Sequence, residues 1–273
     1  MNPATSRSGQ RFATVVAAIA ASLLLLFLAA PTVLLVAHGG ASGLRGLAAD
    51  RELQSALTVT AIAATAATLI AVLLGTPLAW MLARRRMRFA AVLDALLDLP
   101  LLIPHPVAGI ALLIALGRDS AVGGALLALG IRIVGTPLGI VSAMLFVGAP
   151  LYISAARESL ARVEPRYEAV ARTLGDTGWR CFRRITLPLA RRGLLAGAVV
   201  TWARAVSEFG AIVIIAYHPR VASVLAYDRF SSDGLSGALP VAAVLVILSI
   251  VPLALLRALS ARDVAATPRA GRA

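Results

Sequence analysis

The chain has 273 residues, of which 59% are hydrophobic and 14% are charged, and its formal net charge at pH 7 is +13. This composition excludes an ordinary water-soluble domain, which has a smaller apolar share and far more charge. The positive charge does not indicate nucleic-acid binding, because the arginines lie at the ends of apolar runs with few aromatic residues among them. The single cysteine, Cys181, excludes an intrachain disulfide and gives no metal-binding spacing.

The apolar residues gather into blocks long enough to cross the roughly 30 Å of hydrocarbon in a bilayer as helices. They do not alternate with polar residues, which excludes the strands of a membrane β-barrel. We therefore predict an all-α, polytopic membrane protein with six transmembrane helices in one domain, residues 1–273. The predicted spans are 12–37, 54–82, 91–116, 135–156, 193–216 and 238–258.

The distribution of arginine predicts the orientation of these spans. Segments 1–11, 83–90, 157–192 and 257–273 hold 19 of the 26 basic residues, all of which are arginine. By the positive-inside rule this side is cytoplasmic, so both termini are predicted to lie inside. The apolar run at 12–37 is too long for the core of a signal peptide, and we interpret it as a retained helix.

Spans two and three carry polar or helix-breaking residues. The polar face of the second span consists of Thr58, Thr65 and Thr68. A face of this kind serves either helix packing or a solute pathway, and Thr65 is a pathway candidate. The prolines of the third span are Pro100, Pro104 and Pro106. They free backbone carbonyls, so Pro104 and His105 lie either in a packed kink or along a water-lined pathway. Asp94 and Asp98 share a face and are either neutralised by the arginines between 84 and 88 or acids of a pore, and the neutralised elbow is favoured.

A charged, amphipathic segment at 164–188 follows the fourth span, within the cytoplasmic loop 157–192. Glu164 and Pro165 are typical of a helix start, because proline is tolerated in the first turn and an acid suits the helix dipole. An apolar stripe then recurs at helical spacing and ends before Gly175, a typical left-handed helix stop. The stripe consists of Tyr167, Val170, Ala171 and Leu174.

A second short helix is expected next, capped by Asp176 or Thr177. Trp179 and Phe182 would lie on one side of it, and Pro188 would end the unit before span five. Such a hairpin either lies on lipid headgroups or inserts into a groove of a partner protein. The glycine elbow between two helices favours the partner protein.

Span five contains Arg204 and Glu208, the clear charges deep within a predicted span. They are four residues apart and can pair on one helix face. Charge inside a membrane is costly and often functional, so the pair serves either a gate or pathway or a structural ion pair. Gly193 and Gly197, a GxxxG pattern, indicate that another helix approaches span five closely.

The cytoplasmic hairpin carries a recognisable motif. Its residues are Glu168, Ala169, Val170, Ala171, Leu174, Gly175, Ile185, Thr186, Leu187 and Pro188. Gly175 lies ten residues before Ile185 and thirteen before Pro188, and this pattern resembles the EAA loop of permease subunits of ABC importers. Glu168 stands seven residues before Gly175, one more than in the strictest form of that motif.

The resemblance implies a type I ABC importer permease fold whose 164–188 segment is a coupling loop seated on an ATPase. It also implies a second copy of the chain, two cytoplasmic ABC ATPase subunits, an extracytoplasmic solute-binding protein and a prokaryotic plasma membrane. The chain has no GxxxxGK[ST] phosphate loop, so we expect a non-catalytic subunit. We expect it to bind no cofactor or metal, since ATP and Mg²⁺ belong to the partner ATPase.

Segments 99–109, 207–211 and 217–243 resemble molybdate and tungstate permeases more than sulfate permeases. A sulfate, thiosulfate or other anion permease is the alternative within this class. Two other classes stay open: an ion-coupled secondary transporter, although the chain shows no internal repeat, and a membrane scaffold whose hairpin recruits a cytosolic protein.

Overall fold

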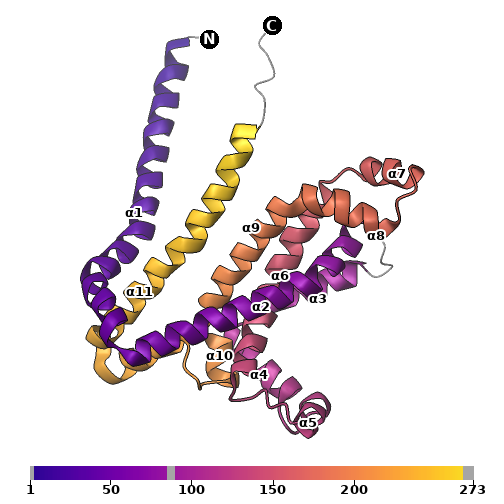
Figure 1. The fold of residues 1–273 in the computed structure, drawn as a ribbon. Helices are drawn as coiled ribbons and strands as arrows, with labels where there is room; N and C mark the ends of the chain where they lie inside the picture. The colour runs from indigo at the N-terminus through magenta and orange to yellow at the C-terminus, as the bar shows by residue number, and fades with distance from the viewer. Residues whose placement is uncertain (1–2, 85–89, 267–273) are drawn as a thin grey trace.

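The computed structural model describes residues 3–84 and 90–266, and all regular structure in these ranges is helical, as predicted. The helices are α1 (Pro3–Ala49), α2 (Arg51–Ala83), α3 (Ala90–Leu102), α4 (His105–Leu116), α5 (Ala121–Ala128), α6 (Pro137–Ala161), α7 (Pro165–Thr173), α8 (Gly178–Cys181), a π-helical turn (Phe182–Thr186), α9 (Leu187–Val206), α10 (Gly210–Ile215) and α11 (Ala222–Ala266). Figure 1 shows their arrangement.

Four or five of the six predicted membrane spans can be recognised in the described part of the chain. Within the described ranges, four helices are long and apolar enough to cross a bilayer: Phe12–Ala49, Arg51–Ala83, Pro137–Ala161 and Ala222–Ile250. A bent pair, Val92–Leu102 with His105–Leu116, makes a fifth if it counts as one span. The count of six therefore stays a prediction.

The predicted third span is broken, as its prolines indicated. Between α3 and α4 the chain turns by 117°, and Pro104 occupies the cap position of α4 in an extended conformation (φ −58°, ψ 136°). A proline disfavours helical geometry in the residue before it and cannot donate a helical hydrogen bond. This explains why α4 restarts here in a new direction.

The predicted span 193–216 is interrupted in the structure, because α9 ends at Val206 and α10 begins at Gly210. The carboxylate of Glu208 accepts a hydrogen bond from the amide of Ala211 at 2.9 Å. The carboxylate thereby satisfies one of the free N–H groups in the first turn of α10. A further kink divides α11 at Gly234, which has φ 68° and ψ −155°.

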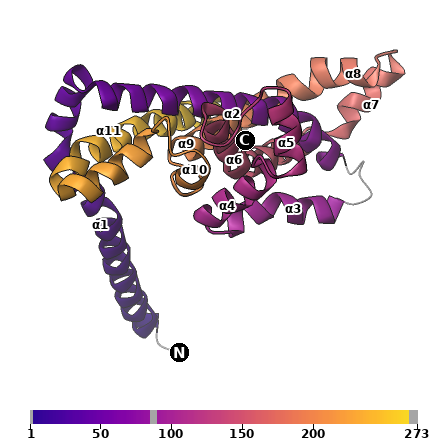
Figure 2. The same ribbon diagram turned by 90° about the horizontal axis from the view of Figure 1, so that it is seen from below.

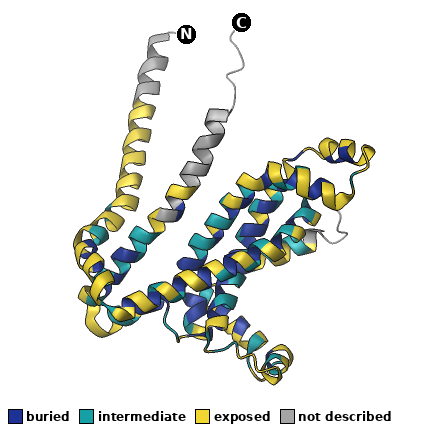
Figure 3. Cartoon of the chain, viewed as in Figure 1, coloured by how far each residue is buried: buried dark blue, intermediate teal, exposed yellow. Residues whose placement is uncertain are grey.

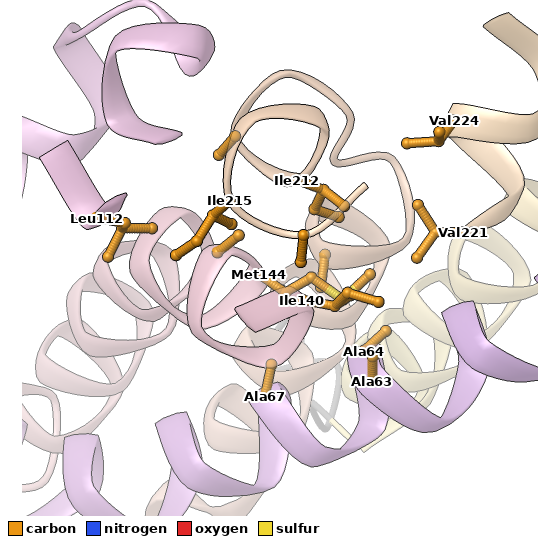
Figure 4. Packing of buried hydrophobic residues seen from close by; sticks show 14 of the residues in the cluster. Ala63, Ala64, Ala67, Leu112, Ile140, Met144, Ile212, Ile215, Val221 and Val224 are labelled. Carbon is orange, nitrogen blue, oxygen red and sulfur yellow. The ribbon is translucent and has the colours of Figure 1, made fainter. Parts of the chain in front are cut away.

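The core lies where α2, α6, α9 and α10 meet. Figure 4 shows buried side chains from these elements packed together, with alanines on α2 facing Ile140 and Met144 of α6. Small residues let helices approach closely. A Cβ added to Gly193 of α9 would lie 2.3 Å from the Oγ of Ser159 on α6, so the close approach predicted from Gly193 and Gly197 is confirmed.

Helix α1 leaves this bundle. Residues 12–29 are exposed on every side of the helix, and Figures 2 and 3 show it projecting from the packed body. Its contact with α11 lies near its end, where Gly39 and Gly43 approach the backbone of Leu239 and Pro240. The start of α1 and the later part of α11 point toward the same end of the molecule (Figure 1).

Candidate functional site

Helices α7 and α8 form a hairpin that projects from one end of the bundle, where α2 and α6 end and α9 begins (Figure 1). Pro165 is the first residue of α7. Gly175 has φ +92°, a left-handed conformation that favours glycine, so the predicted helix stop is confirmed. Thr177 caps α8, its hydroxyl accepting a hydrogen bond from the amide of Arg180 at 3.4 Å.

The hairpin does not end at Pro188 as expected. Helix α8 continues through the π turn directly into α9, and Pro188 lies in the first turn of α9. In the π turn the amide of Leu187 donates to the carbonyl of Phe182. This wider turn accommodates Pro188, which cannot donate a helical bond. Ile185 and Leu187 are half-buried in this continuous segment, and Pro188 is exposed.

The predicted apolar stripe of α7 divides in the structure. Tyr167, Val170 and Leu174 are exposed, the last by 83%, whereas Ala171 is buried. Ala169 is also exposed. We call Tyr167, Val170 and Leu174 the apolar face of α7. Large exposed apolar side chains on a charged hairpin are typical of a protein-binding surface.

On α8 the indole of Trp179 is exposed and stacks on Phe182, with ring centroids 5.6 Å apart. Phe182 is buried and also meets Trp80 of α2 edge to face at 5.3 Å. The two aromatic residues predicted on one side of α8 are therefore in contact. They join the exposed end of the hairpin to α2.

Glu168, the acid of the EAA-like motif, points into the hairpin and is 3% exposed. Its Oε1 accepts hydrogen bonds from Arg84 Nη2 at 2.6 Å and from the Thr186 hydroxyl at 2.7 Å. Its Oε2 accepts one from Arg172 Nη2 at 3.3 Å. Burial alone would raise the pKa of this carboxyl, but the hydrogen bonds from Thr186 and Arg84 and the charges of Arg84 and Arg172 hold it below its usual range.

A second polar cluster joins the two helix breaks. We call His105, Arg204 and Glu208 the break cluster. Arg204 Nη2 lies 2.8 Å from Glu208 Oε2, and the same oxygen lies 3.1 Å from His105 Nδ1. Arg204 Nη2 also lies 2.8 Å from His105 Nε2. Glu208 is buried, whereas Arg204 and His105 are partly exposed. The predicted pairing of Arg204 with Glu208 is confirmed, and its role in a pathway stays a prediction.

Glycine brings the two breaks together. A Cβ on Gly210 of α10 would lie 2.7 Å from the Cβ of His105 and 3.1 Å from Pro106. A Cβ on Gly109 of α4 would lie 2.7 Å from the backbone oxygen of Ala211. Because neither position has room for a side chain, α4 and α10 cross at backbone contact, and His105 reaches the carboxylate of Glu208.

Other predicted residues lie apart from this cluster. The hydroxyl of Thr65 on α2 accepts a hydrogen bond from Trp202 Nε1 at 3.1 Å, and Trp202 lies on a different side of α9 from Arg204. Thr65 thus joins α2 to α9, and its predicted place in a pathway stays untested. Asp94 pairs with Arg157 of α6; of the arginines expected to neutralise it, Arg85, Arg86 and Arg88 lie outside the described residues.

The sequence did not identify the partners of Glu168. Arg84 was one of several arginines in a basic loop, and Thr186 was part of a motif with no role assigned to its hydroxyl. Arg84 also donates to the carbonyl of Val163 at 3.1 Å. Arg84 directly follows a long apolar helix, and this position indicates a cation that anchors the helix end. No local sequence pattern identifies the acid to which it binds.

Comparison with known proteins agrees with this architecture. Residues 75–264 match the family described as "Binding-protein-dependent transport system inner membrane component". The chain is 42% identical over 213 residues to the molybdate/tungstate transport system permease protein WtpB of Thermococcus kodakarensis, covering 78% of this chain and 81% of that protein. It is 32% identical over 215 residues to the sulfate transport system permease protein CysT of Salmonella typhimurium, covering 77% and 78%.

Among solved structures, the fold is similar to a chain of the bacterial alginate ABC transporter, with a TM-score of 0.69 and 18% identity over 94% of this chain and 96% of that chain. At this identity the likeness supports the fold. The family match covers well over half of the chain. The protein therefore belongs to the family of inner-membrane components of binding-protein-dependent transport systems, and it is a multi-pass membrane protein.

Proposed function

We propose that the chain is the permease subunit of an ATP-driven importer for molybdate or tungstate. Two copies would form the translocation pathway, with two cytoplasmic ABC ATPases that bind ATP and Mg²⁺ and an extracytoplasmic binding protein that delivers the oxyanion. Both termini and the α7–α8 hairpin would lie in the cytoplasm of a prokaryotic cell. The 19 arginines on that side support this orientation.

The observation that carries the proposal is the apolar face of α7 on a hairpin continuous with α9. Tyr167, Val170 and Leu174 are exposed beyond the bundle, where a groove of an ATPase could receive them. Because α8 passes into α9 without a break, closure of the ATPases would move α9 together with its partners in the core. The coupling is therefore mechanical, and the chain needs no nucleotide site of its own.

The substrate class rests on the relatives. Identity is 42% to a permease named for molybdate and tungstate and 32% to one named for sulfate. Molybdate, tungstate and sulfate are all tetrahedral dianions, so both relatives support a transporter for this class of anion. The higher identity favours molybdate or tungstate, and a sulfate importer is the alternative.

The test is reconstitution of the permease with its ATPase and binding protein in proteoliposomes. Val170→Asp and Leu174→Asp should abolish oxyanion-stimulated ATP hydrolysis and tungstate uptake, because a carboxylate cannot enter an apolar groove without a partner. Val170→Ile and Leu174→Met are the matched controls, since they keep both exposed positions apolar and should leave hydrolysis and uptake close to wild type. The proposal would be contradicted if the control variants lost transport as well, or if tungstate uptake persisted without ATP.

A further inference from the structure

We infer that Glu168 is a positioning residue that fixes the coupling hairpin to α2 and α9, and that it makes no contact with the ATPase. The consequence for transport rests on the proposed function, whereas the intramolecular contact can be tested on the permease alone. The acid of the EAA-like motif then belongs to the interior of the hairpin and not to its docking surface.

Both oxygens of the carboxylate have partners within the chain. Oε1 accepts two hydrogen bonds from Arg84, at 3.1 and 2.6 Å, and a third from the hydroxyl of Thr186 at 2.7 Å. Oε2 lies 3.3 Å from Arg172. With 3% of Glu168 exposed, a cation of a partner protein could reach this carboxylate only after the hairpin had opened. The residues around Glu168 are exposed instead, and among them is the apolar face of α7.

These contacts join four parts of the chain. Arg84 directly follows α2 and also donates to the carbonyl of Val163, in the turn after α6. Thr186 is the last residue of the π turn that leads into α9. One carboxylate therefore holds α7 against the ends of α2, α6 and α9. A force applied to α7 would therefore be transmitted through Glu168 to α2, α6 and α9. The hairpin would move with these helices and would not rotate separately about its loops.

The only cysteine of the chain lies where it can report this contact. Cys181 is buried, and its Sγ lies 3.8 Å from the backbone oxygen of Glu168 and 4.0 Å from that of Asp176. A thiol reagent can reach this sulfur only when α7 separates from α8. The rate of Cys181 labelling in the native protein therefore measures how often the hairpin opens.

The experiment uses the full-length permease in lipid nanodiscs, without any ATPase, and follows maleimide labelling of Cys181 by mass spectrometry. Glu168→Gln removes the charge and should speed labelling by about tenfold or more, because Arg84 loses its ionic partner. Thr186→Val removes one hydrogen bond and should give a smaller increase in the same direction. Glu164→Gln is the matched control, since Glu164 lies beside α7 with a largely exposed side chain and should leave the rate unchanged.

A residue that only docks on the ATPase would behave differently. In the Glu168→Gln variant of the isolated permease, Cys181 would then be labelled at the wild-type rate. The same variant would no longer copurify with the ATPase, and these two results together would overturn the inference. Should Glu168→Gln fail to yield monodisperse protein, Thr186→Val decides: a wild-type labelling rate in that variant would equally overturn it.

A second measurement is made on the assembled complex. We expect Glu168→Gln to retain the ATPase at close to wild-type affinity, while ATP hydrolysis no longer responds to the loaded binding protein. Failure of the proposed function is distinguishable, because a wild-type permease that binds no ATPase would still show faster Cys181 labelling in Glu168→Gln.

Discussion

His105 Nδ1 lies 3.1 Å from Oε2 of Glu208, so the residue that restarts α4 contacts the residue that interrupts the helix between α9 and α10. Arg204 approaches the same carboxylate oxygen at 2.8 Å. Two helix breaks far apart in the sequence are thus held together by one buried acid. A change in the backbone at one helix break therefore requires the other break to adjust as well.

Removal of the Glu208 carboxylate should destabilise the protein because Arg204 and His105 would lose their shared acceptor. We expect Glu208→Leu to lower the free energy of unfolding by about 2 kcal/mol, a typical cost for an unpaired charged partner that retains some solvent contact. Thermal unfolding in detergent measures this. The double variant Arg204→Met/Glu208→Leu should lose less than the sum of the two single variants. Strict additivity would show that the two side chains are not coupled.

Gly210→Ala should separate α10 from α4. The added methyl group would lie 2.7 Å from the Cβ of His105, and neither neighbour is a flexible chain end, so we expect a loss of about 1–3 kcal/mol. Gly40→Ala is the control, because its nearest contact would lie at an ordinary 3.5 Å. Both variants are compared by thermal unfolding. An equal effect at the two positions would contradict the close crossing of α4 and α10.

Gly175→Ala should strain the hairpin elbow. The left-handed φ of +92° costs a residue with a Cβ about 1 kcal/mol or more. Gly178→Ala serves as control, since it has an ordinary φ and open space around its Cα. Limited proteolysis of the 164–188 segment should become faster in Gly175→Ala alone. Faster cleavage in both variants would point to a cause other than backbone strain.

The Glu168 contacts should contribute stability that depends on pH. The pKa of this carboxyl is held below its ordinary value of 4.5, so the contribution is fully present above that value and is lost as pH falls through the native pKa. The melting temperature of the wild type should therefore exceed that of Glu168→Gln at pH 7, and the gap should narrow below about pH 4.5. A gap that stays constant down to pH 3 would show that ionisation of Glu168 is not the cause.

The hairpin could be predicted from the sequence because its signals are local. Pro165, Gly175 and Thr177 each determine the backbone of their own turn, and all three act as expected. The orientation of Glu168 could not be predicted in the same way. Its partners Arg84 and Thr186 lie 84 and 18 residues away, and helical periodicity assigns a residue to a face without saying what that face meets.

The two helix breaks also differ in whether a local sequence signal predicts them. Three prolines mark the first one in the sequence, and the structure bends there. The second break, at 207–209, contains no proline, and a hydrophobic run alone predicts a continuous helix. Its cause is the contact of Glu208 with the Ala211 amide and with His105. The contact with His105 exists only after α4 has packed against α10.

The uninterrupted helical path from Gly178 to Val206 also fixes a rotational relationship. Trp179 near one end and Arg204 near the other keep a set angular register about a common axis, because no loop between them can absorb torsion. Insertion of one residue after Leu189 would rotate the two ends by about 100° relative to each other. A chain altered in this way could still dock on its partner, but it would do so with the wrong side of the core turned toward the solute.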